Sequence, residues 1–326
     1  MTASPTRPAS PDHGPAPDSQ PPDNPALHSP TPYGHLLAAS GLARHEARRL
    51  MGLVTGQPPT WLIAHADDPA PAEVARRFVA LAARRARGEP LAYLTGEQEF
   101  FGRRFRVSPA VLIPRDDTGT LVEAALARLP QHAGTPSRVL DLGTGSGIVA
   151  ITLALEAPRI EMHAVERSAE ALAVARQNAQ HLDAHIHWHE GSWWTALPSD
   201  PSASPVPTDA SRGPSSTRCD PAQAFDLIVS NPPYVAAADP HLQQGDLRFE
   251  PPGALAAGPD GLDDLRIIIG GAASWLKPGG WLLLEHGHDQ GAAVRALLRQ
   301  AGFADVFTQQ DLAGQDRVGG GRWPCA

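Results

Sequence analysis

The stretch at residues 225–234, Phe-Asp-Leu-Ile-Val-Ser-Asn-Pro-Pro-Tyr, limits the possible folds of this chain more than any other. Its Leu-Ile-Val run is typical of a buried strand in a parallel sheet. Pro232 and Pro233 have no N–H group to give to a sheet, so the strand must end at about Asn231. The Asn231 amide, a rigid turn and the Tyr234 ring therefore follow the carboxyl end of a strand, where open α/β sheets bind ligands. Taken alone, the stretch is also compatible with a strand followed by an ordinary proline turn.

Strands and helices alternate from residue 138 to the C-terminus. This alternation predicts an α/β fold with a doubly wound, mostly parallel, seven-stranded sheet, closed by an antiparallel pair at one edge. The predicted helices lie at 148–156, 169–180, 262–276 and 290–301. The predicted strands lie at 139–140, 162–165, 186–189, 225–230 and 281–285, with two more near Val306 and Val318.

The rest of the chain divides by composition. Residues 1–31 and 199–222 are rich in Pro and Ser and poor in large apolar side chains, so we expect a disordered tail and a disordered insertion. Residues 32–98 carry helical periodicity and form a small helical domain with a predicted docking role. Residues 99–116 follow as a β-hairpin linker, and 117–326 form the α/β domain.

The helical region is basic, although the whole chain has a net charge of −8. Between Gly41 and Arg106 there are 11 Arg against 7 Asp and Glu, a net charge of +4. Such a surface suits docking of an acidic macromolecule, and it is also compatible with a plain solvated arginine face. The acidic total argues against a nucleic-acid partner.

Composition also bears on the compartment. The chain has no apolar run near the ~18 residues of a membrane span and no apolar segment of a signal peptide at its N-terminus, so we predict no membrane partner and a cytoplasmic protein. Its two cysteines have no metal-ligand spacing.

A glycine-rich turn follows the first predicted strand of the α/β domain. Residues 141–147 read Asp-Leu-Gly-Thr-Gly-Ser-Gly, and Ile148 stands where a dinucleotide fingerprint needs its third glycine. Glu166 closes the next strand, where a carboxylate can accept both ribose hydroxyls of a nucleoside. Together with the Asn-Pro-Pro-Tyr turn, these features indicate S-adenosylmethionine (SAM) as the cofactor.

At these turns the chain resembles the class I SAM-dependent methyltransferases, and more closely the bacterial release-factor glutamine N5-methyltransferases, the HemK-like or PrmC family. The resemblance runs from about Leu36 to Trp323. Its most specific stretches are 87–96, 111–115 and 231–251.

The resemblance implies transfer of a methyl group from SAM to the side-chain amide nitrogen, N5, of the glutamine in the Gly-Gly-Gln motif of class-1 peptide chain release factors. Ser192, beside Trp193, and Gly119 stand where the family usually has acids. The implied catalytic residues are Asn231, Pro232 and Tyr234, and Pro233 joins them in binding substrate. The implied cofactor-binding residues are Asp141, Gly143, Thr144, Gly145, Ser146, Gly147, Glu166, Trp193 and Asn231.

A primary amide nitrogen is a poor nucleophile, so the site must align it with the methyl group and accept its hydrogens. The Asn231 side-chain carbonyl and the Pro232 backbone carbonyl are suited to that role, and Tyr234 offers a flat surface to the planar amide. No general base is required before transfer.

Other interpretations remain open. An adenine-N6 nucleic-acid methyltransferase also suits an Asn-Pro-Pro-Tyr turn, and a non-catalytic SAM-binding scaffold would keep the glycine loop. His185, His187 and His189 alternate along one strand and could share a metal, but a solvated face at a sheet edge is commoner, so we assign no metal. The stretch at 285–288, Glu-His-Gly-His, ends a strand near the substrate side and is interpreted as a core terminus.

Overall fold

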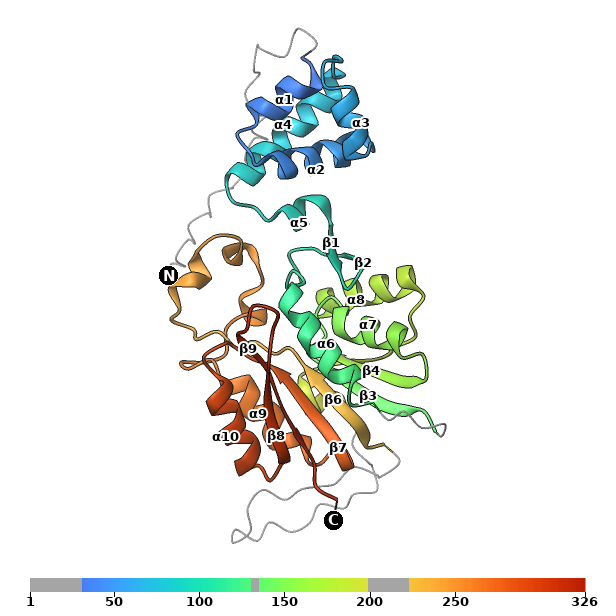
Figure 1. Cartoon of the computed structure of the whole chain (residues 1–326), viewed down its shortest axis with the longest axis vertical. Helices are drawn as coiled ribbons and strands as arrows, with labels where there is room; N and C mark the ends of the chain where they lie inside the picture. Colours follow the sequence, from blue (N-terminus) through green and yellow to red (C-terminus); the bar gives the residue numbers. More distant parts are fainter. Residues whose placement is uncertain (1–30, 130–134, 199–222, 326) are drawn as a thin grey trace, which may run out of the picture. The chain divides into compact units, whose positions relative to one another are not determined.

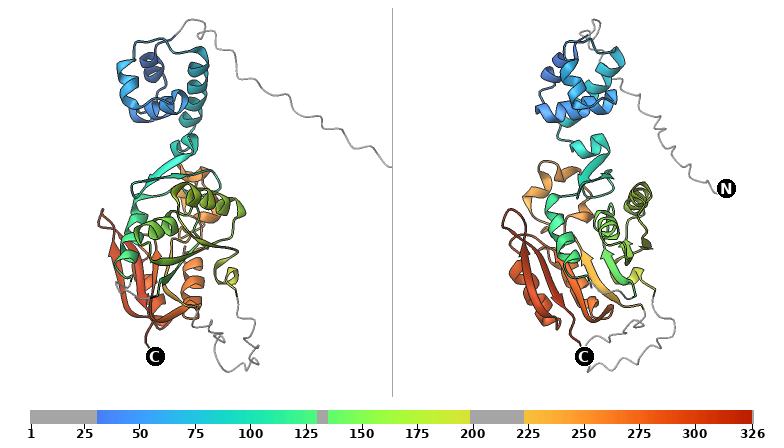
Figure 2. Two further views of the ribbon diagram at one scale, coloured as in Figure 1. Left: turned by 90° about the vertical axis from the view of Figure 1, so that its right-hand side faces the viewer. Right: turned by 45° about the vertical axis from the view of Figure 1, so that its right-hand side comes forward.

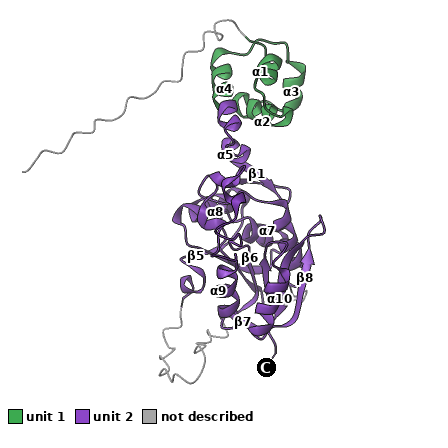
Figure 3. Ribbon diagram, turned by 90° about the vertical axis from the view of Figure 1, so that its left-hand side faces the viewer, with its two compact units in different colours: residues 1–80 green, residues 81–326 purple. Residues whose placement is uncertain are grey.

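The computed structural model describes residues 31–129, 135–198 and 223–325. The predicted tail, apart from residue 31, and the predicted insertion at 199–222 lie outside these ranges. The chain forms two compact units, Met1–Ala80 and Leu81–Ala326 (Figures 1 and 3). Their boundary falls inside helix α4 (Ala72–Ala86).

The first unit is a small bundle of short helices: α1 (Tyr33–Ala39), α2 (Arg44–Thr55), α3 (Pro59–Ala64) and the first part of α4. Helix α2 ends because Gly56 takes the left-handed conformation, with φ of 69°, and its N–H bonds the Gly52 carbonyl. Pro58 and Pro59 then start α3. The bundle closes over a core of Leu50, Met51, Leu62 and Phe78.

The second unit begins with the last residues of α4, helix α5 (Leu91–Thr95) and the predicted hairpin, formed by β1 (Glu97–Phe100) and β2 (Arg103–Arg106). Both turn residues, Phe101 and Gly102, have positive φ, as a tight two-residue hairpin turn requires. The 3₁₀ turn η2 (Asp116–Thr118) follows and leads into α6 (Gly119–Leu126).

The seven-stranded sheet confirms the predicted fold class (Figure 1). Its order is β5-β4-β3-β6-β7-β9-β8; the first five strands are parallel, and β9 is antiparallel to both neighbours. The strands are β3 (Ser137–Leu142), β4 (Ile160–Glu166), β5 (His187–Glu190), β6 (Phe225–Ser230), β7 (Leu276–Glu285), β8 (Ala304–Gln310) and β9 (Asp316–Arg322).

Helices cover both faces of the sheet (Figure 2). Alternate strand residues point to opposite faces. Val139 and Leu227 therefore join the core under α6, α7 (Ile148–Glu156) and α8 (Ala169–Leu182). Leu140 and Ile228 join the core under α9 (Asp263–Ala272) and α10 (Gly291–Gln300). The predicted helix at 262–276 is shorter in the structure because its last residue, Leu276, already begins β7.

The chain order reverses between β3 and β6, which are neighbours in the sheet. In a doubly wound sheet a crevice opens outside the carboxyl ends of the strands at such a reversal. The glycine-rich turn follows β3, and the Asn-Pro-Pro-Tyr turn follows β6. The fold therefore brings together the two turns that the sequence singles out. Among the described residues, no helix has both the length and the apolar character needed to cross a bilayer.

Candidate active site

The glycine-rich turn is tied down by hydrogen bonds to the neighbouring strand. The N–H groups of Gly143 and Thr144 donate to the Val165 carbonyl, at 2.9 and 3.0 Å. The Thr144 hydroxyl donates to Asp141 Oδ2 at 2.6 Å. Asp141 is almost fully buried, and this burial raises the pKa of its carboxyl to about 7. The turn is thus a fixed backbone cradle with one buried acid at its base.

Glu166 closes β4 beside this cradle. Its Oε2 accepts the N–H of Gly145 at 2.9 Å, and its Oε1 accepts the N–H of Ser168 at 2.9 Å. Each carboxylate oxygen has two lone pairs, so both oxygens can still accept a further hydrogen. The carboxylate is therefore held in one orientation and keeps acceptor capacity for a ligand.

The Trp193 ring forms another wall. A Cβ added to Gly143 would lie 3.1 Å from the Trp193 ring, so only glycine permits this close approach. The ring is therefore held by close packing at one face, as a stacking platform for a base must be.

Side chains from three other segments form hydrogen bonds with the Asn-Pro-Pro-Tyr turn. Asn231 Nδ2 donates to the Thr118 hydroxyl at 3.2 Å. The Tyr234 hydroxyl donates to Glu285 Oε1, also at 3.2 Å. Gln290 Nε2 donates to the Tyr234 backbone carbonyl at 2.9 Å. The turn therefore cannot rotate independently of η2, the end of β7 and the start of α10.

One cavity connects the two turns. It is also lined by Thr118, Arg115, Arg167 and Ser192. Gly147, Pro232 and Tyr234 are not among its lining residues. The predicted site residues that line the cavity are Asp141, Gly143, Thr144, Gly145, Ser146, Glu166, Trp193, Asn231 and Pro233.

The predicted residues outside the lining have visible structural contacts. Gly147 starts α7 with φ of 85°, and a Cβ there would lie 2.8 Å from Ile151 Cδ1, so this glycine permits close packing of the turn on its helix. Tyr234 is largely buried and bonds Glu285. Burial, together with the charge of Glu285, raises the pKa of Tyr234 above its usual value, so the phenol stays protonated.

Sequence reasoning missed several polar residues that hold the cavity together. Glu250 is buried, accepts the N–H of Ile113 at 3.2 Å and forms an ion pair with Arg115. Asn178 is fully buried in α8 and donates to the Ser146 carbonyl at 2.8 Å, bracing the glycine-rich turn. Asn178 was detectable, because it is a polar residue on the otherwise apolar face of a predicted helix. Nothing local distinguishes Glu250.

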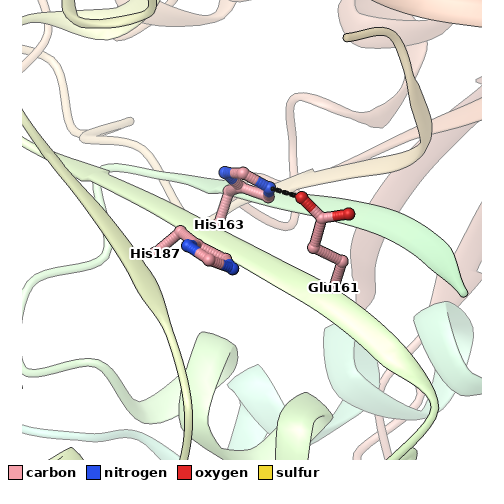
Figure 4. A group of neighbouring side chains, drawn as sticks. All are labelled: Glu161, His163 and His187. Carbon is pink, nitrogen blue, oxygen red and sulfur yellow. Dashed lines mark hydrogen bonds and ion pairs between the residues drawn. The ribbon is translucent and has the colours of Figure 1, made fainter. Parts of the chain in front are cut away.

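A histidine cluster lies on β4 and β5 (Figure 4). Glu161, His163 and His187 offer ligand atoms within 4.8 Å of one another, and His189 Nε2 lies 3.0 Å from His163 Nδ1. The Arg138 guanidinium hydrogen-bonds two members of this cluster. Its Nη2 lies 3.1 Å from His163 Nε2, and its Nε lies 3.3 Å from Glu161 Oε1. Burial lowers the pKa of His163 to about 4.

None of these residues lines the cavity, and the predicted third member, His185, is exposed and precedes β5. A divalent ion bound here would lie beside the positive charge of Arg138. The assignment of no metal therefore stays our prediction.

Two family models and several proteins of one family match this chain. Residues 34–96 match the family described as the PrmC N-terminal domain, and residues 135–313 match a methyltransferase domain family. The chain is 49% identical over 286 residues to the release factor glutamine methyltransferase of Bordetella pertussis, covering 88% of this chain and 97% of that protein. The chain belongs to the release factor glutamine methyltransferase family.

Other members of that family are similarly related. The Xylella fastidiosa member is 48% identical over 297 residues, with 90% of this chain and 99% of that protein covered. The Escherichia coli member is 44% identical over 288 residues, with 88% and 95% covered. Membership in the release factor glutamine methyltransferase family makes the chain an enzyme, a SAM-dependent methyltransferase.

Proposed function

We propose that this chain transfers the methyl group of SAM to the N5 nitrogen of the glutamine in the Gly-Gly-Gln motif of class-1 peptide chain release factors. The observation that carries the proposal is the shared cavity: Asn231 and Pro233 line it together with the glycine-rich turn and Glu166. A methyl donor bound against that turn would lie in the same cavity as the amide-binding residues.

The chemistry of the lining fits the cofactor. Glu166 would accept the ribose hydroxyls, since both of its oxygens retain acceptor capacity. Trp193 would pack against the adenine, with Ser192 and backbone groups in place of the family's usual acid. The buried Asp141 would face the positively charged methionine part. Bound there, the cofactor supplies an electrophilic methyl group that needs no further activation.

On the substrate side, the residues of this chain orient a planar, neutral amide. The Asn231 carbonyl would accept one N5 hydrogen and the Pro232 backbone carbonyl the other, which directs the nitrogen lone pair toward the methyl group. A primary amide has two N–H hydrogens, one for each of these acceptors. A group without hydrogens to donate could bond neither acceptor, so its binding is disfavoured. Pro233 and Tyr234 would restrict the amide plane, and the bond from Tyr234 to Glu285 keeps that ring from turning.

The helical domain would dock the release factor. Arg44 and Arg77 are exposed on α2 and α4, and the surrounding region carries the excess positive charge counted above. We expect enzyme and substrate to meet in the cytoplasm, without nucleic acid or membrane.

The direct test is mass spectrometry of the release-factor glutamine peptide after incubation with enzyme and SAM. We expect a mass increase of one methylene on the Gly-Gly-Gln glutamine. A parallel incubation with DNA distinguishes the adenine-N6 alternative, because methylated DNA and unmodified release factor would overturn the proposal. SAM binding without methylation of either substrate would leave the scaffold interpretation.

A further inference from the structure

The Trp193 ring, which forms one wall of the cavity, belongs to a residue with an unfavourable backbone conformation. Its φ is 46°, in the left-handed region. A bulky side chain makes this region unfavourable, so a residue such as tryptophan stays there only where its surroundings hold it. Packing of the ring against Gly143 supplies part of that hold. Contacts of the chain on both sides of Trp193 supply the rest.

On the N-terminal side, the chain is bonded to the sheet. The N–H of Gly191 donates to the Glu166 backbone carbonyl at 2.9 Å, at the end of β4. The Thr195 hydroxyl and N–H both donate to the Ser192 carbonyl, at 2.6 and 3.1 Å, and these two bonds close a tight turn around Trp193. The backbone that leads into Trp193 is therefore fixed relative to the glycine-rich turn.

On the C-terminal side, Trp194 is bound to helix α9. Its indole N–H donates to the Ile267 carbonyl at 3.1 Å. A Cβ added to Gly271 would overlap the indole, so the ring occupies the space that a side chain at this position would fill. The Trp275 ring lies nearly parallel to it, with centroids 6.4 Å apart and an interplanar angle of 8°. Trp194 is not among the residues that line the cavity, so its contacts are with the helix.

These two attachments prevent the backbone of Trp193 from relaxing. Rotation about its N–Cα bond to a negative φ would swing the Trp193 ring and the chain that follows it relative to Gly191. Because Gly191 is bonded to β4 and Trp194 to α9, that rotation requires one of the two attachments to break. The docked Trp194 ring and the left-handed conformation of Trp193 therefore depend on each other.

We propose that Trp194 is a positioning residue: its docking against Gly271 on α9 holds the Trp193 ring in the cavity wall, preorganised for the adenine of SAM. The inference rests on the proposed packing of Trp193 against the adenine. When Trp194 is released, the backbone at Trp193 relaxes and carries the ring away from the wall. SAM must then restore the unfavourable conformation as it binds, so its affinity falls. Once SAM is bound the wall is re-formed, and kcat is preserved.

Two neighbouring glycines of α9 provide a matched pair for the test. Gly271→Ala places a methyl group against the Trp194 indole, whereas a Cβ at Gly270 meets no atom within 4 Å. Both substitutions add one methyl group and raise the propensity of the same helix. In the full-length enzyme, Gly271→Ala should weaken SAM binding about 5- to 50-fold by calorimetry. Its kcat for release factor at saturating SAM should stay within about threefold of wild type. Gly270→Ala should alter neither quantity.

Substitution of Trp194 itself gives a second route to the same result. Trp194→Ala removes the ring and should weaken SAM binding as much as Gly271→Ala does. Trp194→Phe keeps an aromatic ring beside Gly271 and loses the N–H bond to Ile267, so it should recover most of the affinity. A thermal melt of each ligand-free variant checks that it is folded. If Gly271→Ala does not fold, the comparison of the two Trp194 variants decides the test.

Two double-mutant cycles test whether the effect passes through the two rings. In the Trp194→Ala background there is no indole to displace, so adding Gly271→Ala should change SAM affinity by less than about twofold. In the Trp193→Ala background no ring remains to be positioned, so the same addition should again change SAM affinity by less than about twofold. An undiminished effect of Gly271→Ala in either background overturns the inference, because the added methyl group would then act by another route.

The outcomes separate this inference from the proposed function. If Trp193→Ala weakens SAM binding while Gly271→Ala behaves like Gly270→Ala, the positioning role is wrong and the adenine-packing role stands. If Gly271→Ala lowers kcat at saturating SAM as much as it lowers SAM affinity, the contact is merely structural and the inference is overturned. If Trp193→Ala binds SAM as wild type does, the adenine-packing role fails and the positioning role fails with it. Methyl transfer to the Gly-Gly-Gln glutamine is decided separately, by mass spectrometry.

Discussion

On the cofactor side of the cavity, contacts come from a few short stretches of chain; on the substrate side, side chains from distant segments converge. Glu166 and Gly145, which bond each other on the cofactor side, are 21 residues apart. Asn231 and Thr118, which bond each other on the substrate side, are 113 residues apart.

The two sides of the cavity are also built from different chemical groups. Backbone N–H groups and glycine conformations form much of the cofactor side, and these are fixed by local geometry. The substrate side depends on polar side chains that are oriented by other buried polar side chains. Substitutions on the cofactor side should therefore reduce the affinity for SAM, whereas substitutions on the substrate side should reduce the rate of methyl transfer.

The largest expected effect is on the substrate side. Asn231→Ala should lower the methyl-transfer rate by about 10²–10³, the usual loss when one preorganised hydrogen-bonding group is removed from a reacting centre. SAM affinity, measured by calorimetry, should change little, because other contacts hold the cofactor. A single-turnover rate above a tenth of wild type would contradict the assignment.

The converse effect is expected on the cofactor side. Glu166→Ala removes the acceptor for the ribose and also frees the N–H groups of Gly145 and Ser168. A hydrogen bond to a charged group contributes roughly 1.5–3 kcal/mol, so SAM affinity should fall at least about tenfold. The rate at saturating SAM should stay within a few fold of wild type. Glu166→Gln, which keeps one carbonyl oxygen, is the matched control and should lose less affinity.

The same difference explains how much could be predicted from sequence. The order of strands and helices, the hairpin and the position of both turns followed from periodicity and from Gly and Pro. Helix α7 and strand β6 have the predicted bounds. Most of the predicted cofactor residues also line the cavity, since glycines and a strand-terminal acid carry local signals.

The supporting residues of the substrate side carry no such signal. Glu250 bonds Ile113, 137 residues away, and only the folded chain brings them together. Thr118 stands in a short acidic segment that looks like an ordinary helix start. The short helices α1 and α3 lie within the predicted helical domain but carry no signal of their own, because 7 and 6 residues span too few turns to show a period.

Each side of the cavity holds one buried carboxyl, Asp141 or Glu285, and burial raises the pKa of each to about 7. In the unfolded chain these groups lose their protons near pH 4, so between about pH 4 and 7 the folded protein holds more protons. The unfolding free energy should therefore fall as pH rises through this window, by up to about 1.4 kcal/mol per pH unit for each group.

Urea denaturation at a series of pH values checks this, with Asp141→Asn and Glu285→Gln as single variants. Each variant should show a shallower decline than wild type, and the comparison with wild type removes the opposite contribution of buried histidines such as His163. Saturating SAM should reduce the Asp141 contribution, because its positive charge favours the ionised carboxylate, and should leave the Glu285 contribution. Parallel curves for wild type and both variants would mean that neither carboxyl titrates in this range.

The smallest expected effect lies farthest from the chemistry. Arg44→Glu with Arg77→Glu reverses two exposed charges of the helical domain, and we expect KM for intact release factor to rise several fold. Exposed charge pairs contribute about 0.2–1 kcal/mol each, and salt screens them, so the rise in KM should shrink as ionic strength increases.

The matched control is Arg159→Glu with Arg299→Glu, which makes the same change in net charge at exposed positions of the α/β domain. If both pairs raise KM equally, bulk charge rather than the helical domain governs the encounter. If neither pair does, while SAM affinity is unchanged in both, docking does not depend on these arginines. A short Gly-Gly-Gln peptide, too small to reach a separate docking surface, should be methylated equally well by all three proteins.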